Sequence, residues 1–496
     1  MHKFDHIELD WIKRWALYSP DNIALQSVEE DRKLTYSELN ALINKAAGYL
    51  TSELEVYAGD RVAILSMNRL DYVILFFAIQ RLGAIMLPLN YRLAAPEIDF
   101  QLDNSGAQIL IYEEDFGETV SKLRTAVNTF DFTAVMEGVH QKTEQNYTHV
   151  GEFETPCMIL YTSGTTGRPK GALITNKMLF WNSINTGLRL NLTQNEVILT
   201  FAPFFHTGGW NVLTTPVLHR GGKVILLKKF DPAQILSLSE VEKASILFGV
   251  PTMMAMMAED PSFETTDLST IRYAIVGGEP MPIPLIETWQ NKGIPIRQGY
   301  GLTEFGPNVF SLNEEDAIRK KGSIGFPNFY IDAAIFDDNG NQLGANQIGE
   351  LWLKGPVCMA GYWNNEEATS KTIENGWLKT GDMVKRDEEG YYYIVDRKKD
   401  MFISGAENVY PAEIEHVIRS HDDVKDVAVV GVPDEKWGEV GKAFVVSRSG
   451  ESSEEDLRAF CKENLAKFKV PKYIKFLDEL PKSDTGKILK RTLKEL

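Results

Sequence analysis

Alternating helical and strand-like segments in the first half of the chain constrain its fold most strongly. Apolar residues recur at helical spacing from Leu39 to Leu50, and Asp60-Arg-Val-Ala-Ile-Leu-Ser66 then has the pattern of a buried strand. The pattern continues with a helix over 72–80, a strand over 84–88, a short helix near 97–102 and a strand over 108–112. Because such alternation is typical of parallel sheets covered by helices, the sequence predicts an α/β fold with largely parallel sheets.

The last hundred residues follow a different pattern. After Asp396-Arg397 the chain enters the charged link Lys398-Lys-Asp400, and a compact α+β arrangement follows. We expect a helix over 411–420, strands over 424–432 and 442–446, and a helix over 454–465. The sequence therefore predicts a large domain over residues 1–396 and a small, mobile α+β domain over residues 397–496.

Composition narrows the class of protein. The chain has 52 Lys and Arg against 69 Asp and Glu, a net charge of −17, which gives no general attraction for nucleic acid or anionic lipid. Its longest apolar run, residues 72–79, is far shorter than the roughly 20 residues that span a bilayer. The acidic N-terminus does not have the pattern of a secretion signal. The three cysteines lie far apart in the sequence, which favours a reducing compartment. We expect a soluble, cytoplasmic protein.

The strongest chemical signal is a loop rich in Gly, Thr and Ser after the apolar strand Cys157–Leu160. It reads Tyr161-Thr-Ser-Gly-Thr-Thr-Gly-Arg-Pro-Lys-Gly171. Its glycines allow the backbone to bend sharply, so that amides and hydroxyls face a phosphate chain, and Lys170 supplies charge for the distal phosphates. The spacing is not that of a Walker A loop, since proline precedes the lysine. An ordinary polar turn between a strand and a helix is the alternative interpretation.

This loop resembles the phosphate loop of the adenylate-forming superfamily, which includes acyl-CoA synthetases, firefly-type luciferases and peptide-synthetase adenylation domains. Other motifs of that superfamily follow in the expected order over nearly the whole chain. They are Phe204–Thr207, Gly277–Pro280, Tyr300–Glu304, Thr380–Asp382, Asp396–Arg397, Ser404–Asn408 and Pro481–Lys487. The runs Lys399–Gly405, Glu407–Glu413 and Pro433–Gly438 resemble those of bacterial fatty-acyl-CoA synthetases.

The resemblance implies a nucleotide site. Tyr300 would stack on adenine opposite the backbone of Gly277–Glu279, Glu304 and Thr162 would hold Mg²⁺, and Asp382 would accept hydrogen bonds from the ribose hydroxyls. Arg397 would donate to the ribose or to a phosphate. Two alternatives stay open: Glu304 as an acid that stabilises a helix N-terminus, and Asp382 and Arg397 as a structural ion pair. The residues expected to bind ATP and CoA are Thr162, Ser163, Gly164, Thr165, Thr166, Gly167, Lys170, Gly277, Gly278, Glu279, Tyr300, Gly301, Thr303, Asp382, Arg397, Lys399 and Gly405.

The resemblance also implies two half-reactions. A carboxylate and ATP give an acyl-adenylate and pyrophosphate, and a thiol then takes the acyl group. Lys487 is the expected catalytic cation of the first step, because its charge would offset repulsion between the carboxylate and the α-phosphate. The small domain would then rotate about a hinge near Lys399 and bring in the loop around Gly405. Many relatives have Gly-Gly where this chain has Gly405-Ala406, which puts the path of the thiol arm in doubt.

The expected acid site lies around His206, which matches a family position beside the acyl carboxylate and joins Lys170 and Lys487 as a catalytic candidate. No acidic residue occurs between Thr200 and His219, so a substrate ammonium would lack a counter-charge there. Trp210 stands where some long-chain relatives have a tryptophan that closes the acyl tunnel. Met253, Met256 and Met257 share one helical face, and their deformable side chains suit an aliphatic chain. Ordinary core packing is the alternative for Trp210 and for the methionines.

Together these features predict an ATP-dependent carboxylate–CoA ligase for a medium- or long-chain fatty acid, with ATP, Mg²⁺ and coenzyme A as cofactors and cosubstrates. An enzyme that loads a carrier protein, and a CoA ligase for an aryl or short branched acid, are the main alternatives. A luciferase-like oxygenase is permitted by the fold, but no feature of the sequence calls for it. A non-catalytic nucleotide-binding protein is less favoured, since Lys170, Glu304, Asp382, Arg397 and Lys487 are all present. The sequence leaves open whether the protein forms a homo-oligomer.

Overall fold

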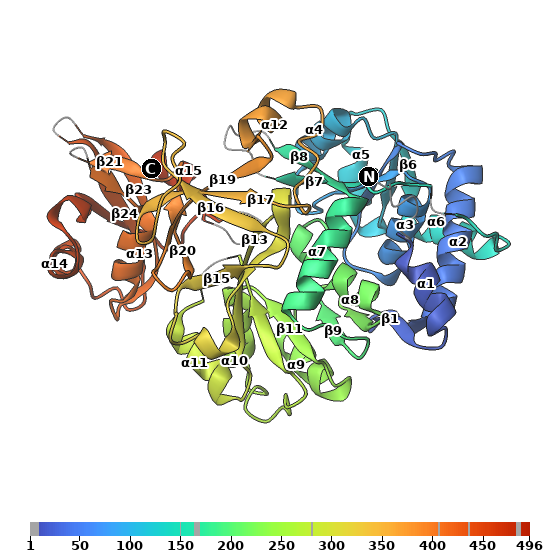
Figure 1. Cartoon of the computed structure of the whole chain (residues 1–496), viewed down its shortest axis with the longest axis horizontal. Helices are drawn as coiled ribbons and strands as arrows, with labels where there is room; N and C mark the ends of the chain where they lie inside the picture. The colour runs from blue at the N-terminus through green and yellow to red at the C-terminus, as the bar shows by residue number, and fades with distance from the viewer. Residues whose placement is uncertain are drawn as a thin grey trace. The chain divides into compact units, whose positions relative to one another are not determined.

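The computed structural model of the chain describes residues 9–148, 150–162, 169–278, 281–404, 407–434, 437–482 and 488–496. These residues form two compact units (Figure 1). The first comprises residues up to 333 together with 353–378, and the second comprises 334–352 together with 379–496. The sequence predicts a domain boundary between residues 396 and 397, beside the expected hinge at Lys399. That boundary stays a prediction. Among the described residues, none of the helices is both long and apolar enough to cross a membrane.

One sheet of the first unit is parallel except at one edge. Its strands lie in the order β6 (Asn128–Asp131), β5 (Ile109–Tyr112), β3 (Arg61–Leu65), β4 (Ile85–Pro88), β7 (Pro156–Thr162) and β8 (Lys170–Thr175), with only the β7–β8 pair antiparallel. The predicted strands over 60–66, 84–88 and 108–112 are confirmed. The loop before Lys170 joins two strands, rather than a strand and a helix.

A second sheet in this unit is also parallel through its centre. Its strands run in the order β2 (Arg32–Thr35), β1 (Ile23–Ser27), β10 (Lys223–Leu226), β9 (Val197–Thr200), β11 (Ile246–Gly249), β12 (Tyr273–Val276), β13 (Ile296–Leu302), β14 (Gly306–Ser311) and β15 (Ser323–Pro327). The six central strands, β1, β10, β9, β11, β12 and β13, pair in parallel. Strands β2, β14 and β15 pair antiparallel to their neighbours. The prediction of largely parallel sheets is therefore confirmed.

Helices cover these sheets because each has one apolar face to bury. Helices α9 (Pro232–Val241), α10 (Pro251–Glu259) and α11 (Ile283–Asn291) lie together against the second sheet (Figure 1) and share its apolar core. The remaining helices of this unit are α1 (Trp11–Tyr18), α2 (Tyr36–Glu53), α3 (Leu70–Arg81), α4 (Ala95–Ser105), α5 (Gly117–Ser121), α6 (Phe132–Gln141), α7 (Asn176–Arg189), α8 (Thr214–Arg220) and α12 (Glu366–Thr372). The predicted helices over 72–80 and 97–102 are confirmed as parts of α3 and α4.

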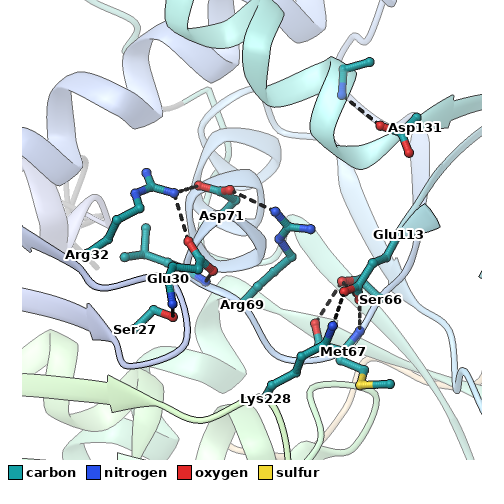
Figure 2. A network of polar contacts seen from close by, with 12 residues as sticks. Ser27, Glu30, Arg32, Ser66, Met67, Arg69, Asp71, Glu113, Asp131 and Lys228 are labelled. Carbon is teal, nitrogen blue, oxygen red and sulfur yellow. Dashed lines mark hydrogen bonds and ion pairs between the residues drawn. The ribbon is translucent and has the colours of Figure 1, made fainter. Parts of the chain in front are cut away.

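Polar side chains join the two sheets of the first unit where their strands end (Figure 2). Glu113, just after β5, accepts hydrogen bonds from Met67 N at 3.0 Å and Ser66 Oγ at 3.1 Å, both just after β3. Its other oxygen lies 2.6 Å from Nζ of Lys228, which follows β10 in the second sheet. Burial by itself would raise the pKa of Glu113, but the bonds from Lys228 and Met67 outweigh it and hold the pKa below its ordinary value. Beside them, Asp71 pairs with Arg32 at 3.0 Å (Figure 2).

The second unit contains two groups of strands. Strands β16 (Asp332–Phe336), β17 (Ile348–Lys354), β19 (Trp377–Arg386) and β20 (Tyr392–Arg397) lie side by side. The short β18 (Ile373–Glu374) belongs to the first unit and pairs there with Trp377 and Leu378, the first two residues of β19. The C-terminal sheet contains β22 (Glu407–Val409), β21 (Phe402–Ser404), β24 (Gly438–Ser447), β23 (Val424–Asp434) and β25 (Tyr473–Phe476). Helices α13 (Pro411–Arg419), α14 (Glu454–Asn464) and α15 (Lys490–Lys494) accompany it. The predicted α+β pattern of this part is confirmed.

Candidate functional site

The phosphate-loop motif lies between two paired strands. Strand β7 ends at Thr162, β8 begins at Lys170, and these two residues are partners in the antiparallel ladder. The ends of the loop are therefore held side by side, with both flanking side chains at one end of the hairpin. The predicted nucleotide-binding residues within the loop, Ser163, Gly164, Thr165, Thr166 and Gly167, lie outside the described residues.

Thr162 and Glu304, predicted to hold a metal together, are in direct contact although 142 residues separate them in the sequence. The Thr162 hydroxyl donates to Glu304 Oε1 at 3.1 Å. Glu304 lies in the short turn η3 (Thr303–Phe305), which begins at the predicted Thr303. The same carboxylate oxygen accepts a second hydrogen bond, at 3.0 Å, from the hydroxyl of Tyr362.

Tyr362 is a site residue that the sequence analysis missed. Its segment runs antiparallel to β8: Tyr362 bridges to Ala172, and Trp363 N donates to Gly171 O at 2.8 Å. Nζ of Lys170 lies 5.0 Å from the centre of the Tyr362 ring, within the range of a cation–π contact. Burial, followed by the nearby Glu304 carboxylate, raises the pKa of the Tyr362 hydroxyl. Tyr362 is therefore a neutral donor that connects Glu304 to Lys170.

The expected adenine side of the site is formed by strand ends that demand glycine. A side chain at Gly301 would place its Cβ 2.2 Å from the backbone of Pro307, and Gly278 has φ of +89°, a conformation that favours glycine. Tyr300, on β13, packs edge-on against Phe310 with ring centroids 5.8 Å apart. At Gly277 a Cβ would lie 3.5 Å from Gly299 O, an ordinary contact distance, so this position does not require glycine. The predicted Glu279 lies outside the described residues.

The segment that carries His206 is held from both sides. The buried amide of Asn68 donates to Ala202 O at 2.9 Å and accepts from Phe204 N at 3.0 Å. Trp210 donates from Nε1 to Phe204 O at 2.5 Å. The partly buried imidazole of His206 packs against the ring of Phe205, at 4.4 Å between centroids.

Immediately after His206 the chain forms a π-helical turn, η2 (Gly208–Val212). Such turns are rare and are found frequently at functional sites. A small hollow lies beside it, lined by residues in and around β9, the turn, the start of α8 and β11: Leu199, Thr200, Phe201, Ala202, Gly208, Gly209, Leu213, Thr214 and Phe248. None of these lining residues is charged.

The structure assigns Trp210 to the core. Its side chain is buried and stacks on Phe204 at 4.1 Å, and it also packs against Tyr72 and Phe76. These contacts agree with the core-packing alternative, and a role in closing an acyl tunnel stays a prediction.

The predicted methionine face lies on helix α10 and is only partly buried, and its role in binding an acyl chain stays a prediction. Helix α10 buries Met254 and Met257 and leaves Met256 half exposed, while Met253 packs partly against the core. The buried side of the helix is therefore centred on Met254 and not on the side shared by Met253, Met256 and Met257.

In the second unit, Asp382 and Arg397 are partners on β19 and β20. Arg397 Nε lies 2.7 Å from Asp382 Oδ1, and the Asp382 side chain is only 4% exposed. Asp382 and Arg397 thus form the ion pair that the sequence analysis gave as the alternative, and ribose binding by these residues stays a prediction. Lys399 is exposed in the tight turn between β20 and β21. Two predicted residues, Gly405 and Lys487, lie outside the described residues.

The donor set around Glu304 fits a magnesium ion. Mg²⁺ prefers hard oxygen ligands and is commonly held by one or two carboxylates together with substrate phosphates. Glu304 supplies a carboxylate, Thr162 a hydroxyl beside it, and the hairpin end places Lys170 near both.

Comparison with known proteins gives a consistent result. The family model for AMP-binding enzymes matches residues 12–363, and the model for their C-terminal domain matches residues 413–487. The chain is 40% identical to feruloyl-CoA synthase of an Amycolatopsis species and 38% identical to a long-chain-fatty-acid–CoA ligase of Mycobacterium tuberculosis, with 97% and 98% of each chain covered. It resembles o-succinylbenzoate coenzyme A synthetase of Bacillus subtilis in complex with ATP and magnesium ion, with TM-score 0.89, 34% identity, and coverage of 98% of this chain and 99% of that chain. The chain therefore belongs to the AMP-binding enzymes, the adenylate-forming superfamily that its motifs resemble.

Proposed function

We propose that this protein is an ATP-dependent acid–CoA ligase that activates a medium- or long-chain fatty acid. The coarser part, an AMP-forming acid–CoA ligase, follows from its family. In the first step a carboxylate oxygen bonds to the α-phosphorus of ATP and pyrophosphate leaves. In the second step the sulfur of coenzyme A bonds to the acyl carbon and AMP leaves.

The observation that carries this proposal is the cluster of Thr162, Lys170, Glu304 and Tyr362. It places a carboxylate, two hydroxyls and an ammonium at the end of one hairpin, beside the phosphate-loop motif. Glu304 and Thr162 would hold Mg²⁺, which supplies charge neutralisation for the triphosphate when it is bound. Lys170 would contact the distal phosphates, and the Tyr362 hydroxyl keeps the Glu304 carboxylate oriented.

The aliphatic acid is supported by the surroundings of His206. The cavity beside the π-helical turn is lined by uncharged side chains, so it offers no counter-charge for the ammonium of an amino acid. His206 would lie at the acyl carboxylate, as the resemblance implies.

An aryl acid is the second candidate. Feruloyl-CoA synthase, named for an aromatic acid, is 40% identical to this chain, and Phe201 and Phe248 in the cavity wall suit a ring as well as a chain. A panel of straight-chain and aryl acids, assayed for CoA thioester formation with each acid at equal concentration, separates the two. A higher kcat/KM for octanoate and longer acids than for cinnamate-type acids supports the first candidate, and the reverse order supports the second.

The roles proposed for Lys487 and Lys399 are tested by separating the half-reactions. Lys487→Ala is expected to depress acyl-adenylate formation while leaving thioester formation from supplied acyl-adenylate largely intact. Lys399→Pro is expected to hinder the second half-reaction more than the first, because proline restricts the backbone at the proposed hinge. Equal losses in both half-reactions would contradict either assignment.

A further inference from the structure

The π-helical turn η2 is braced by side chains in addition to its own backbone bonds. Four consecutive carbonyls, those of residues 209–212, accept hydrogen bonds from side-chain donors. These bonds are Thr214 Oγ1 to Gly209 O at 2.7 Å, Thr215 Oγ1 to Trp210 O at 3.2 Å, Asn182 Nδ2 to Asn211 O at 2.7 Å and Asn308 Nδ2 to Val212 O at 3.0 Å. A carbonyl oxygen can accept two hydrogen bonds, so these side-chain donors add to the backbone bonds of the turn and fix its conformation.

Asn308 is the donor that ties the turn to the nucleotide motif. It lies on β14, four residues after Glu304, and its Nδ2 also lies 2.7 Å from Thr186 Oγ1 and 3.2 Å from Asn211 O. Asn182, on α7, reaches the same carbonyl of Asn211 and packs beside the first residue of β14, since a Cβ at Gly306 would lie 3.1 Å from Asn182 Oδ1. Two buried or half-buried amides from different elements therefore converge on one end of the turn.

The other end of the turn forms the wall of the candidate acid cavity. Gly208 and Gly209 line it together with Leu213. The turn also packs tightly on the segment that leads to His206, because a Cβ at Gly209 would lie 2.4 Å from Pro203 O. A change in the helical register of η2 would therefore move both the cavity wall and the approach to His206.

We infer that Asn308 and Asn182 are positioning residues that set the acid specificity of the enzyme by holding η2 in its π-helical form. Without their donors, the turn loses bonds that favour its π-helical form over the commoner α-helical register, in which each N–H binds the carbonyl four residues back. That shift would reshape the cavity while leaving the nucleotide cluster of Thr162, Glu304 and Tyr362 in place. This inference rests on the proposed function, since it names what determines the choice of acid at that site.

The test replaces each amide by its isosteric acid. Asn308→Asp turns the donor that faces two carbonyls into an acceptor, and Asn182→Asp does the same to a single bond, so it is the milder variant. Asn176→Asp is the matched control: it is equally buried, lies on the same helix as Asn182, and donates to Glu152 O at 3.0 Å, away from η2. Each protein is assayed for KM and kcat with ATP and with a series of acids, and hydrogen exchange is measured over residues 208–214.

Asn308→Asp is expected to raise KM for the preferred acid by about tenfold, the effect of losing one or two buried hydrogen bonds. KM for ATP should change by less than about twofold, exchange over 208–214 should rise, and the order of preferred acids should change. The control should alter none of these quantities. Equal changes in KM for ATP and acid, or an unchanged acid profile in both variants, would overturn the inference. A wild-type enzyme that activates no acid would instead refute the proposed function, and the specificity role with it.

Discussion

Replacement of His219 is expected to change how the stability of the first unit depends on pH. The imidazole lies on α8, the helix that follows η2, where it stacks on Trp11 with ring centroids 4.0 Å apart and also packs against Phe180. Its Nδ1 is 2.7 Å from Ser183 Oγ. Burial, with a smaller contribution from the charge of Arg220, lowers the pKa of His219 from 6.5 to about 3.

The magnitude follows from linkage between protonation and folding. Between pH 7 and pH 5 the unfolded imidazole takes up a proton, whereas the folded one does not, so stability falls as pH falls. One pH unit is worth about 1.4 kcal/mol once the unfolded group titrates fully, so this single residue costs about 2 kcal/mol over that range. The loss would be complete only near the folded pKa of about 3.

The assay compares His219→Phe with the wild-type chain by urea unfolding, followed by tryptophan fluorescence at several pH values from 7 to 5. The variant keeps an aromatic ring stacked on Trp11, and this ring cannot titrate. Between pH 7 and pH 5 its free energy of unfolding should therefore fall by about 2 kcal/mol less than that of the wild type. His140→Phe, at an exposed histidine on α6, is the control and should follow the wild-type slope. Identical slopes for wild type and His219→Phe, or an imidazole that titrates near pH 6.5 in the folded chain by NMR, would refute the reasoning.

Three further predictions concern backbone packing, a buried ion pair and the metal site. Gly301→Ala should destabilise the first unit by about 1–3 kcal/mol and weaken the thermal stabilisation by ATP, because its Cβ would meet the backbone of Pro307 at 2.2 Å; an unchanged melting temperature would contradict this. Asp10→Ala should cost about 3–5 kcal/mol in chemical unfolding, since it leaves the buried guanidinium of Arg81 without its partner at 2.8 Å; a loss below about 1 kcal/mol would argue against it. Glu304→Gln should leave the fold intact by circular dichroism but raise the Mg²⁺ concentration for half-maximal adenylation by about tenfold or more, and an unchanged requirement would remove Glu304 from the metal site.

Much of the fold could be predicted because local patterns carry it. The longer apolar run of α3 and the short run of β-branched and aliphatic residues in β3 distinguish these elements by length and composition. Helix α10 was also expected, but its buried face was not. The spacing of its four methionines fits either of two adjacent faces of a helix. Only the position of the sheet decides that Met254 and Met257 are buried and Met256 is not.

The candidate site was predicted where motifs are local and missed where contacts are made by distant segments. Thr162 and Glu304 were assigned together from the resemblance, and their hydrogen bond brings them together as that assignment requires. Tyr362 has no local signal: it joins them only because its segment pairs with β8, nearly 190 residues earlier in the chain. The π-helical turn is equally hidden, since its hydrogen bonds depend on amides from α7 and β14.

The central claim is that the site joins a fatty acid to AMP, and acid-dependent exchange of labelled pyrophosphate into ATP tests it most directly. The assay is run without coenzyme A, across straight-chain fatty acids, aryl acids and amino acids, so that it reports the first half-reaction alone. We predict exchange that requires Mg²⁺, peaks at one aliphatic chain length and is lost in Lys487→Ala. Exchange with aryl acids but not with fatty acids would contradict the proposed substrate, and the absence of exchange with every acid would contradict the proposed reaction.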